Sequence, residues 1–484
     1  MPRGGPLPPQ RTDAVGERGA GRLADAAFVL LLLFVATAPL LSGPSSEANP
    51  AAWGRDAATI AEITPLLLFG FVIASSTFFS GSPLASPRRL AIPLTAAAAL
   101  ALLGVVQIVP LPEGLLRTVA PANVQIYHDT AEILRLFGDP APLRPRISLA
   151  PGETLVATLS FLAAAALFYS AASLLKDRRR RRWLLAVLLG SALVQLVVAA
   201  IRSAGGGPLR GTLPGPGDLA GYLEIALAVA FGTLWAEVLT NRDRASEAVR
   251  ESERFERRFS PLAARGLVFG LISAGLLATK DRAAILAAGV TLPLLTMAAL
   301  FHRRARGRRR AAVGALFPLL LGLFLLAAGA VGGGRLFRFL DAGAGGAPGV
   351  FREESRKTAV AAWRQSPLFG SGLGAFRDAF RRAQPRSLEG VVEHAGDDAL
   401  ELLVTGGAVG LILTLTLLLS LFVLLFRRWR RQMHREESAL ALAGLGALLS
   451  LSLHGVSEMN LSVPAVSGTL AAVLGAAWAS GSAR

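Results

Sequence analysis

The chain has 484 residues, of which 52% are hydrophobic and 17% are charged, and its mean hydropathy is +0.50. This composition excludes a soluble globular domain and is typical of a polytopic membrane protein. No cysteine is present, which excludes disulfides, thiolate nucleophiles and Cys-based metal sites. The net charge of +17 does not indicate nucleic-acid binding, because the arginines lie in short blocks between apolar runs, as topology signals do.

Apolar segments of nearly bilayer-spanning length predict an all-α fold of about 12 transmembrane helices. In chain order the segments are Ala26–Leu41, Ile60–Phe79, Leu90–Val109, Leu155–Leu175, Trp183–Ile201, Leu219–Leu239, Leu262–Thr279, Ala283–Phe301, Ala311–Val331, Leu400–Phe426, Ala439–His454 and Val463–Ala479. The connection Lys280–Arg282 is the shortest, so we expect a hairpin of the seventh and eighth helices.

The same pattern divides the chain into five parts. These are a Pro/Gly/Arg-rich cytoplasmic tail predicted to be disordered (1–25), N-terminal helices (26–201), central helices with arginine-bearing outer loops (202–331), a long outer loop (332–399) and C-terminal helices (400–484).

Basic residues predict the orientation of these helices. With both termini inside, the short inner loops carry 25 Lys and Arg, against 9 in the short outer loops. Positive charge favours the cytoplasmic side, so both termini are expected there. The loop 332–399 then lies outside, on the same side as Arg202, Arg210, Lys280 and Arg282.

The long outer loop has two notable features. Alternating polar and apolar residues predict an amphipathic helix at Glu354–Gln365, lying near the membrane surface. From Arg352 to Arg386 the loop holds eight basic residues against three acids, which suits either anionic lipid head groups or a phosphorylated substrate. The stretch FGSGLGAF, with glycines at 370, 372 and 374, fits a phosphate cradle or a tight turn.

The segment VVEHAGDDALELLVTGGAVGLIL, residues 391–413, opens the tenth predicted helix with ionisable side chains. His394, Asp397, Asp398 and Glu401 have the i, i+3, i+4, i+7 spacing that places side chains on one face of a helix. Charge beside hydrocarbon is costly, which makes this cluster a candidate site. A solvated first helical turn explains the two aspartates but leaves the histidine unexplained.

Five segments together resemble the O-antigen ligase and polymerase superfamily. They are PLFGSGLGAF, EHAGDDALELLVTGGAVGLIL, LRGTLPGPGDLAGYL, LLATKDRAAILA and LHGVSEMNLSVPAVSGTLAAVLG, and the resemblance spans roughly residues 202–479. The chain has Gly215 and Gly217 where the family usually has asparagines, Asp281 where it has serine, and Glu458 where it has aspartate.

The resemblance implies a GT-C-like membrane glycosyltransferase that takes a glycan from a polyprenyl (undecaprenyl) diphosphate carrier. The acceptor would be a lipid A core sugar, another glycan or a protein hydroxyl, so ligase, polymerase and O-oligosaccharyltransferase activities stay open. It also implies a bacterial inner membrane, an active site on the periplasmic face, and neither a nucleotide sugar nor a metal cofactor.

The chemistry of that reaction suggests roles for individual side chains. Arg210 and Arg282 are the first candidates for holding the diphosphate leaving group, followed by Lys280 and Arg202. His394 is the candidate general base, since its ordinary pKa is near neutral. Supporting or acceptor-binding candidates are Asp397, Asp398, Glu401, Tyr222, Glu224, His454 and Glu458. A metal held by His394, Asp397 and Asp398 ranks lower.

Two other classes of function remain open. Twelve helices with both ends inside also suit a transporter or flippase for a lipid-linked glycan, although transporters place binding residues near the bilayer midplane and are often built from repeats. An inactive scaffold is the other alternative, because the chain departs from the family motifs.

Overall fold

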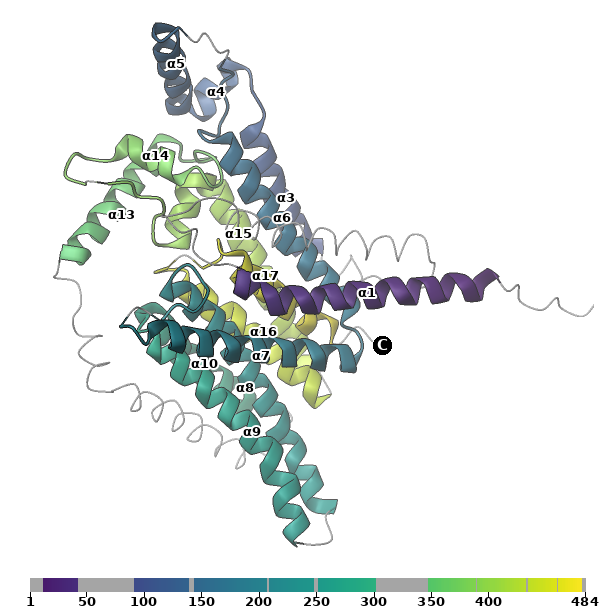
Figure 1. Cartoon of the computed structure of the whole chain (residues 1–484). Coiled ribbons are helices and arrows are strands. Elements are labelled where there is room, and N and C mark those ends of the chain that lie inside the picture. Colours follow the sequence, from purple (N-terminus) through teal and green to yellow (C-terminus); the bar gives the residue numbers. More distant parts are fainter. Residues whose placement is uncertain are drawn as a thin grey trace, which may run out of the picture.

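The computed structural model describes residues 12–41, 91–138, 143–206, 209–247, 251–301, 347–388, 390–431, 434–458 and 460–480, and within these ranges all regular secondary structure is helical (Figure 1). Nine of the described helices are long and apolar enough to cross a membrane. They are α1 (Thr12–Leu41), α3 (Ala91–Ile108), α6 (Pro151–Leu174), α7 (Arg178–Ser203), α8 (Pro216–Glu247), α9 (Glu251–Ala278), α10 (Arg282–Phe301), α15 (Asp398–Arg431) and α16 (Arg435–His454). The protein is therefore an all-α polytopic membrane protein.

Ten of the twelve predicted segments coincide with described helices, the last being the shorter apolar helix α17 (Pro464–Ala479). The segments Ile60–Phe79 and Ala311–Val331 lie outside the described residues, as does the start of the long outer loop. The prediction of a disordered tail was wrong for residues 12–25, which belong to α1. The apolar part of α1 already forms a helix, and extending that helix toward the N-terminus costs little entropy because only nucleation is unfavourable.

The centre of the bundle is formed by α8 and α16, whose apolar segments are almost wholly buried, whereas most residues of α15 are only partly buried. These two central helices approach closely where Gly232 of α8 faces Ala439 and Ala443 of α16. Small residues at such crossings let two backbones pack tightly, which stabilises helix pairs in membranes. The shorter apolar helix α17 packs against α6.

The expected hairpin of the seventh and eighth helices is only partly correct. A short turn, residues 279–281, does join α9 to α10. The two helices nevertheless pack mainly against other elements, α9 against α8 and α10 against α16. The turn is sharp because Lys280 adopts a positive φ of 59°, which separates the directions of the two helices.

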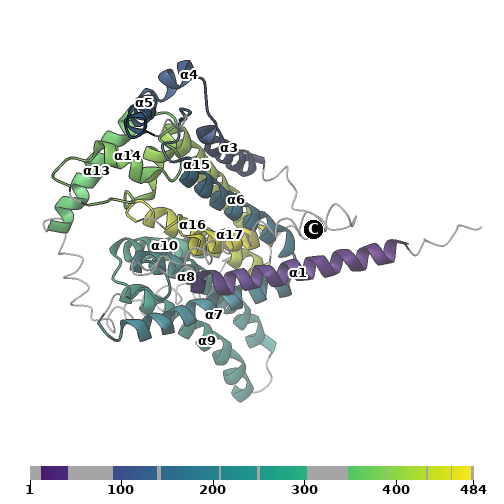
Figure 2. The same cartoon turned by 45° about the horizontal axis from the view of Figure 1, so that its top comes forward.

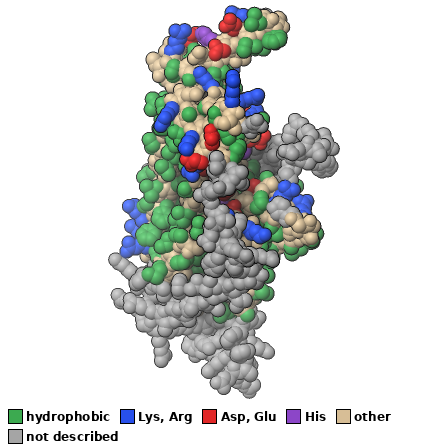
Figure 3. Space-filling view, turned by 90° about the vertical axis from the view of Figure 1, so that its left-hand side faces the viewer, with side chains coloured by type: hydrophobic (Ala, Val, Ile, Leu, Met, Phe, Trp, Pro, Cys, Tyr) green, Lys and Arg blue, Asp and Glu red, His purple; other side chains and the backbone are tan. Residues whose placement is uncertain are grey.

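Four shorter helices gather at one end of the molecule (Figures 1 and 2). They are α4 (Glu113–Val119), α5 (Pro121–Leu136), α13 (Ala347–Gln365) and α14 (Phe376–Ala383). The predicted helix Glu354–Gln365 is present as the larger part of α13. In α14 the rings of Phe376 and Phe380 are buried, while Arg377 and Arg381 are exposed. Figure 3 shows Lys and Arg side chains scattered over the face that it presents.

Helix α15 is interrupted at Gly407, where the backbone turns to φ 67° and ψ −169°. The glycine-rich segment 367–372 packs into this break. The amides of Ala408 and Val409 donate to the carbonyls of Pro367 and Leu368 at 2.8 and 3.1 Å. The segment therefore replaces hydrogen bonds that the helix loses at its break.

Further contacts fix the same junction from both sides. The amides of Ser371 and Gly372 donate to the carbonyls of Val404 and Thr405, each at 3.0 Å. The buried side chain of Gln107 on α3 donates from Nε2 to the carbonyls of Phe369 and Thr405, at 2.7 and 3.0 Å, and accepts from the amide of Leu373 at 2.9 Å.

Glycine is required on both sides of this junction. Gly370 and Gly407 both have positive φ, and a β-carbon on either would collide with the backbone of the other segment. FGSGLGAF therefore forms a tight turn packed against protein, and the phosphate cradle considered from its sequence does not fit this packing.

We predict that Gly407→Ala and Gly370→Ala each destabilise the folded protein by about 1–3 kcal/mol, because alanine disfavours positive φ and its methyl group collides with backbone. The matched control is Gly289→Ala on α10, where a β-carbon meets nothing within 4 Å. Thermal unfolding of the full chain in detergent would measure the effect. Equal melting temperatures for Gly407→Ala and Gly289→Ala would contradict the prediction.

Candidate functional site

His394 and Glu401 form a hydrogen-bonded pair at the start of α15. His394 Nδ1 lies 3.0 Å from Glu401 Oε1, and the amide of Ala395 donates to Glu401 Oε2 at 2.8 Å. The helix begins only at Asp398, so the assumption that His394 shares a helical face with the three carboxylates was wrong. Gly396, at φ 71°, instead lets the chain fold back so that the imidazole reaches Glu401.

The environment of His394 suits proton transfer. The imidazole is more than half exposed, whereas the Glu401 side chain is 13% exposed. The hydrogen bond to Glu401 raises the pKa of His394 above its ordinary value, against the opposing effect of burial. Asp218, at the start of α8, lies near enough to add to this effect.

Asp397 has a structural role rather than an open position for substrate. Its Oδ1 accepts a hydrogen bond from the amide of Leu400 at 2.8 Å, which caps the N-terminus of α15. Its Oδ2 accepts from Arg356 on α13 at 3.2 Å. One carboxylate oxygen therefore caps α15, and the other holds the start of α15 to α13.

Asp398 joins α15 to the end of α16. Its amide donates to the carbonyl of Gly455 at 2.9 Å. Its carboxylate lies so close to Gly455 that a β-carbon there would be 2.7 Å from Oδ2. The start of α15 is thus fixed against the turn that follows His454.

His454 and Glu224 form a buried charged centre between α16 and α8. His454 Nδ1 lies 2.9 Å from Glu224 Oε2, and both side chains have no exposed surface. Ser450 donates to the other oxygen of Glu224 at 2.9 Å. His454 Nε2 lies 3.5 Å from Asp281 Oδ1. His454 thus lies between two carboxylates, which favour the charged form of the imidazole.

Asp281 connects this centre to the start of α10. The amide of Ala284 donates to Asp281 Oδ1 at 2.9 Å, so Asp281 caps the helix that begins with Arg282. Burial raises the pKa of Asp281, but the adjacent His454 imidazole and the hydrogen bonds from backbone amides outweigh it and leave the pKa below its ordinary value. The carboxylates of Asp281 and Glu458 both face Gly217 at the start of α8.

The four candidate diphosphate ligands lie in or at the ends of the two connections that join α7 to α8 and α9 to α10. Arg202, Arg210 and Lys280 are exposed, and Arg282 is half-buried. Arg202 donates to the carbonyl of Gly211 at 2.9 Å, so it also supports the loop that carries Arg210. The structure places Arg282 next to Asp281, and therefore beside the buried His454 centre.

Two supporting candidates differ in setting. Tyr222 is fully buried in the main core, which leaves its ring without access to a substrate from outside. Glu458 is half-buried beside the start of α8. Among the residues that the structure describes, no three His, Asp or Glu side chains are arranged to share a metal ion.

Sequence reasoning missed three residues that complete the arrangement: Gln107, Asp218 and Asp281. The sequence could have indicated Asp218 and Asp281, because each lies at the N-terminus of a helix, where an acidic side chain is favoured. The indication for Gln107 is weaker, because it is only a polar side chain near the end of an apolar helix.

We predict that Glu224→Gln and His454→Ala each destabilise the protein by roughly 3–5 kcal/mol, because each leaves a buried charge without its partner. Ser450→Ala is the matched control and should cost about 1 kcal/mol, the value of one hydrogen bond. The double variant should cost less than the two single variants added together, in thermal or denaturant unfolding of the full chain. Additive effects would mean that the two side chains are not coupled.

Comparison with known proteins identifies part of this region. Residues 267–415 match the model of a family described as O-antigen ligase. The match contains Lys280, Arg282, His394 and Glu401, whereas Arg210, Glu224, His454 and Glu458 lie outside it. No curated protein matches the chain. This part of the multi-pass helical membrane protein is therefore similar to the O-antigen ligase family.

Proposed function

We propose that the protein transfers a glycan from a polyprenyl diphosphate carrier to an acceptor hydroxyl, at the periplasmic face of a bacterial inner membrane. The observation that carries the proposal is the His394–Glu401 pair, which lies at the same ends of the helices as the loops bearing Arg210 and Arg282. The matched O-antigen ligase domain supports a transfer of this general kind.

His394 acts as the general base. With Nδ1–H donating to Glu401, the imidazole keeps Nε2 unprotonated and able to accept a proton. Glu401 also stabilises the imidazolium that forms, in the manner of a carboxylate that orients a catalytic histidine. The acceptor hydroxyl loses its proton to Nε2 as its oxygen attacks the anomeric carbon of the donor.

The leaving group is the polyprenyl diphosphate. The bond from the anomeric carbon to the phosphate oxygen breaks, the bond to the acceptor oxygen forms, and negative charge develops on the diphosphate. Arg210 and Arg282 hold this charge, with Lys280 and Arg202 in or at the end of the same two connections between helices. Exposed and half-buried arginines on outer loops suit a large amphipathic substrate that arrives along the membrane surface.

The buried centre has a positioning role in this scheme. Asp281 caps α10 and contacts His454, so the backbone that carries Arg282 is fixed by the Glu224–His454 pair. Fixed cations stabilise developing charge better than mobile ones, because no reorganisation accompanies the reaction.

Three acceptors suit this chemistry: a lipid A core sugar, a growing polysaccharide or a protein hydroxyl. A ligase, a polymerase and an O-oligosaccharyltransferase differ in that choice alone. In each case the termini are cytoplasmic, as the positive charge of the short loops favours, and the lipid bilayer holds the carrier.

We predict that purified full-length protein with a polyprenyl-diphosphate glycan and candidate acceptors forms a new glycosidic bond in the presence of EDTA. His394→Ala should lower the transfer rate about 10²–10⁴-fold and Arg282→Ala about 10²–10³-fold. Chromatography of the labelled product and carrier measures both.

The matched controls are His128→Ala and Arg135→Ala, on the exposed face of α5, and both should keep the wild-type rate. Full activity of well-folded His394→Ala would remove the proposed base. Movement of the carrier across liposomes without a new bond would favour a transporter.

We predict that the acidic limb of the pH–rate profile reports His394. The neutral imidazole is active, so the rate rises as pH passes its pKa. Glu401 raises that pKa, hence Glu401→Gln should move the limb to lower pH. Glu393→Gln is the matched control and should move it less, because Glu393 acts on His394 only through its charge. A limb that stays in place or moves to higher pH in Glu401→Gln would contradict the assignment.

A further inference from the structure

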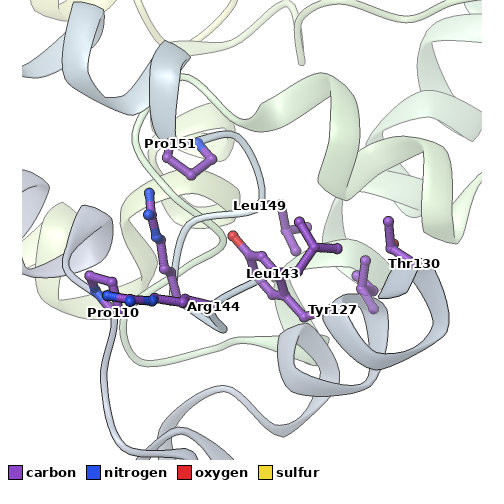
Figure 4. Close-up of a pocket in the computed structure, with 9 residues that line it drawn as sticks. Pro110, Tyr127, Thr130, Leu143, Arg144, Leu149 and Pro151 are labelled. Carbon is purple, nitrogen blue, oxygen red and sulfur yellow. The ribbon is translucent and has the colours of Figure 1, made fainter. Parts of the chain in front are cut away.

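A separate pocket lies beneath α5, outside the site described above. Its volume is about 580 Å³, and its lining residues are Pro110, Ile126, Tyr127, Thr130, Leu143, Arg144, Arg146, Leu149 and Pro151. Figure 4 shows Arg144 near Pro110, with Tyr127, Leu143 and Leu149 on the other side. An apolar lining with a few polar groups is the usual composition of a small-molecule site.

The polar groups of this pocket carry positive charge. Arg144 and Arg146 have no ion-pair partner among the described residues. Arginine presents a planar fork of donors that matches phosphate and carboxylate groups. The pocket therefore offers two guanidinium groups to an anion.

Tyr127 supplies a rigid aromatic wall. Its hydroxyl donates to the carbonyl of Ser148 at 2.7 Å, which fixes the ring against the segment that carries the arginines. Burial raises the pKa of Tyr127 above its ordinary value, so the hydroxyl stays protonated. An aromatic face beside hydrogen-bonding groups suits the apolar face of a sugar ring.

The pocket adjoins the junction that fixes α15. The amide of Leu149, a lining residue, donates to the carbonyl of Ser371 in the glycine-rich segment at 2.9 Å. The amide of Ser148 donates to the backbone carbonyl of Gln107 at 2.9 Å. The stretch that carries the two arginines therefore lines the pocket with one side. With its other side it contacts the glycine-rich segment that packs into the break of α15.

From this arrangement we infer that the pocket binds an anionic saccharide, with the phosphate or carboxylate on Arg144 and Arg146 and the sugar ring against Tyr127. The inference rests on the proposed function, since it makes the pocket a binding site for a charged sugar of the glycan substrate. It explains why two arginines without ion-pair partners line an otherwise apolar hollow beside the junction.

Isothermal titration calorimetry of the full-length protein in neutral detergent tests this directly. The probes are glucose 6-phosphate, glucuronate, glucose and inorganic phosphate. Glucose 6-phosphate and glucuronate should bind more tightly than glucose or phosphate, because only they engage both the arginines and the ring. Arg144→Ala and Arg146→Ala should each weaken their binding at least about tenfold.

The matched control is Arg135→Ala, an exposed arginine at the end of α5 that does not line the pocket, and it should leave binding unchanged. Three results would overturn the inference. They are unchanged binding in the Arg144→Ala/Arg146→Ala double variant, an equal loss in Arg135→Ala, and equal affinity for glucose and glucose 6-phosphate.

Nanodiscs of defined lipid composition test whether the two arginines bind the phosphate of a lipid head group instead of a saccharide. Binding of glucose 6-phosphate should be the same in phosphatidylcholine and phosphatidylglycerol. Loss of binding in phosphatidylglycerol alone would assign the arginines to lipid head groups and overturn the saccharide assignment. Because calorimetry needs no turnover, saccharide binding in a protein without transfer activity would refute the proposed function and leave the pocket standing.

Discussion

The break in α15 at Gly407 and the glycine-rich segment 367–372 that fills it form the contact on which the site depends. A broken helix within a membrane protein leaves amides and carbonyls that must find partners, because lipid offers none. The segment supplies those partners through backbone alone, which is why Gly370 and Gly407 face each other without side chains. Gln107 on α3 adds hydrogen bonds to both partners, so three regions distant in sequence meet at one point.

Everything at the start of α15 follows from that anchor. The part of α15 that precedes Gly407 is fixed at one end by this junction and at the other by Asp397, which contacts Arg356 of α13. Asp398 then ties it to the turn after α16, and Glu401 faces His394. The two histidines of this region differ in setting as a consequence. His394 is exposed and can exchange protons, whereas His454 is enclosed between carboxylates and fixes the helices around Arg282.

The sequence predicted the fold class and ten of the helices, because long apolar runs have few alternatives to a membrane helix. It also grouped His394 with Glu401 in one candidate site, but for a wrong reason, since their contact arises from a turn at Gly396 and not from helical spacing. The packing of α9 and α10 against other helices, and the pairing of Glu224 with His454, depend on contacts between distant segments. No local pattern encodes such contacts. The burial of Tyr222 was missed for the same reason, because α8 is apolar on all sides and the sequence does not tell which side meets solvent.

The central claim is that the loop-filled break in α15 places Glu401 so that His394 becomes a base of raised pKa. Titration of ¹³C-labelled histidine by NMR, in full-length wild type and Gly407→Ala, measures that pKa directly. We expect a wild-type His394 pKa above the ordinary value of about 6.5. We also expect a fall toward that value in Gly407→Ala, since the displaced helix start weakens the contact with Glu401. A wild-type pKa at or below 6.5, or a raised pKa that Gly407→Ala leaves unchanged, would contradict the central claim.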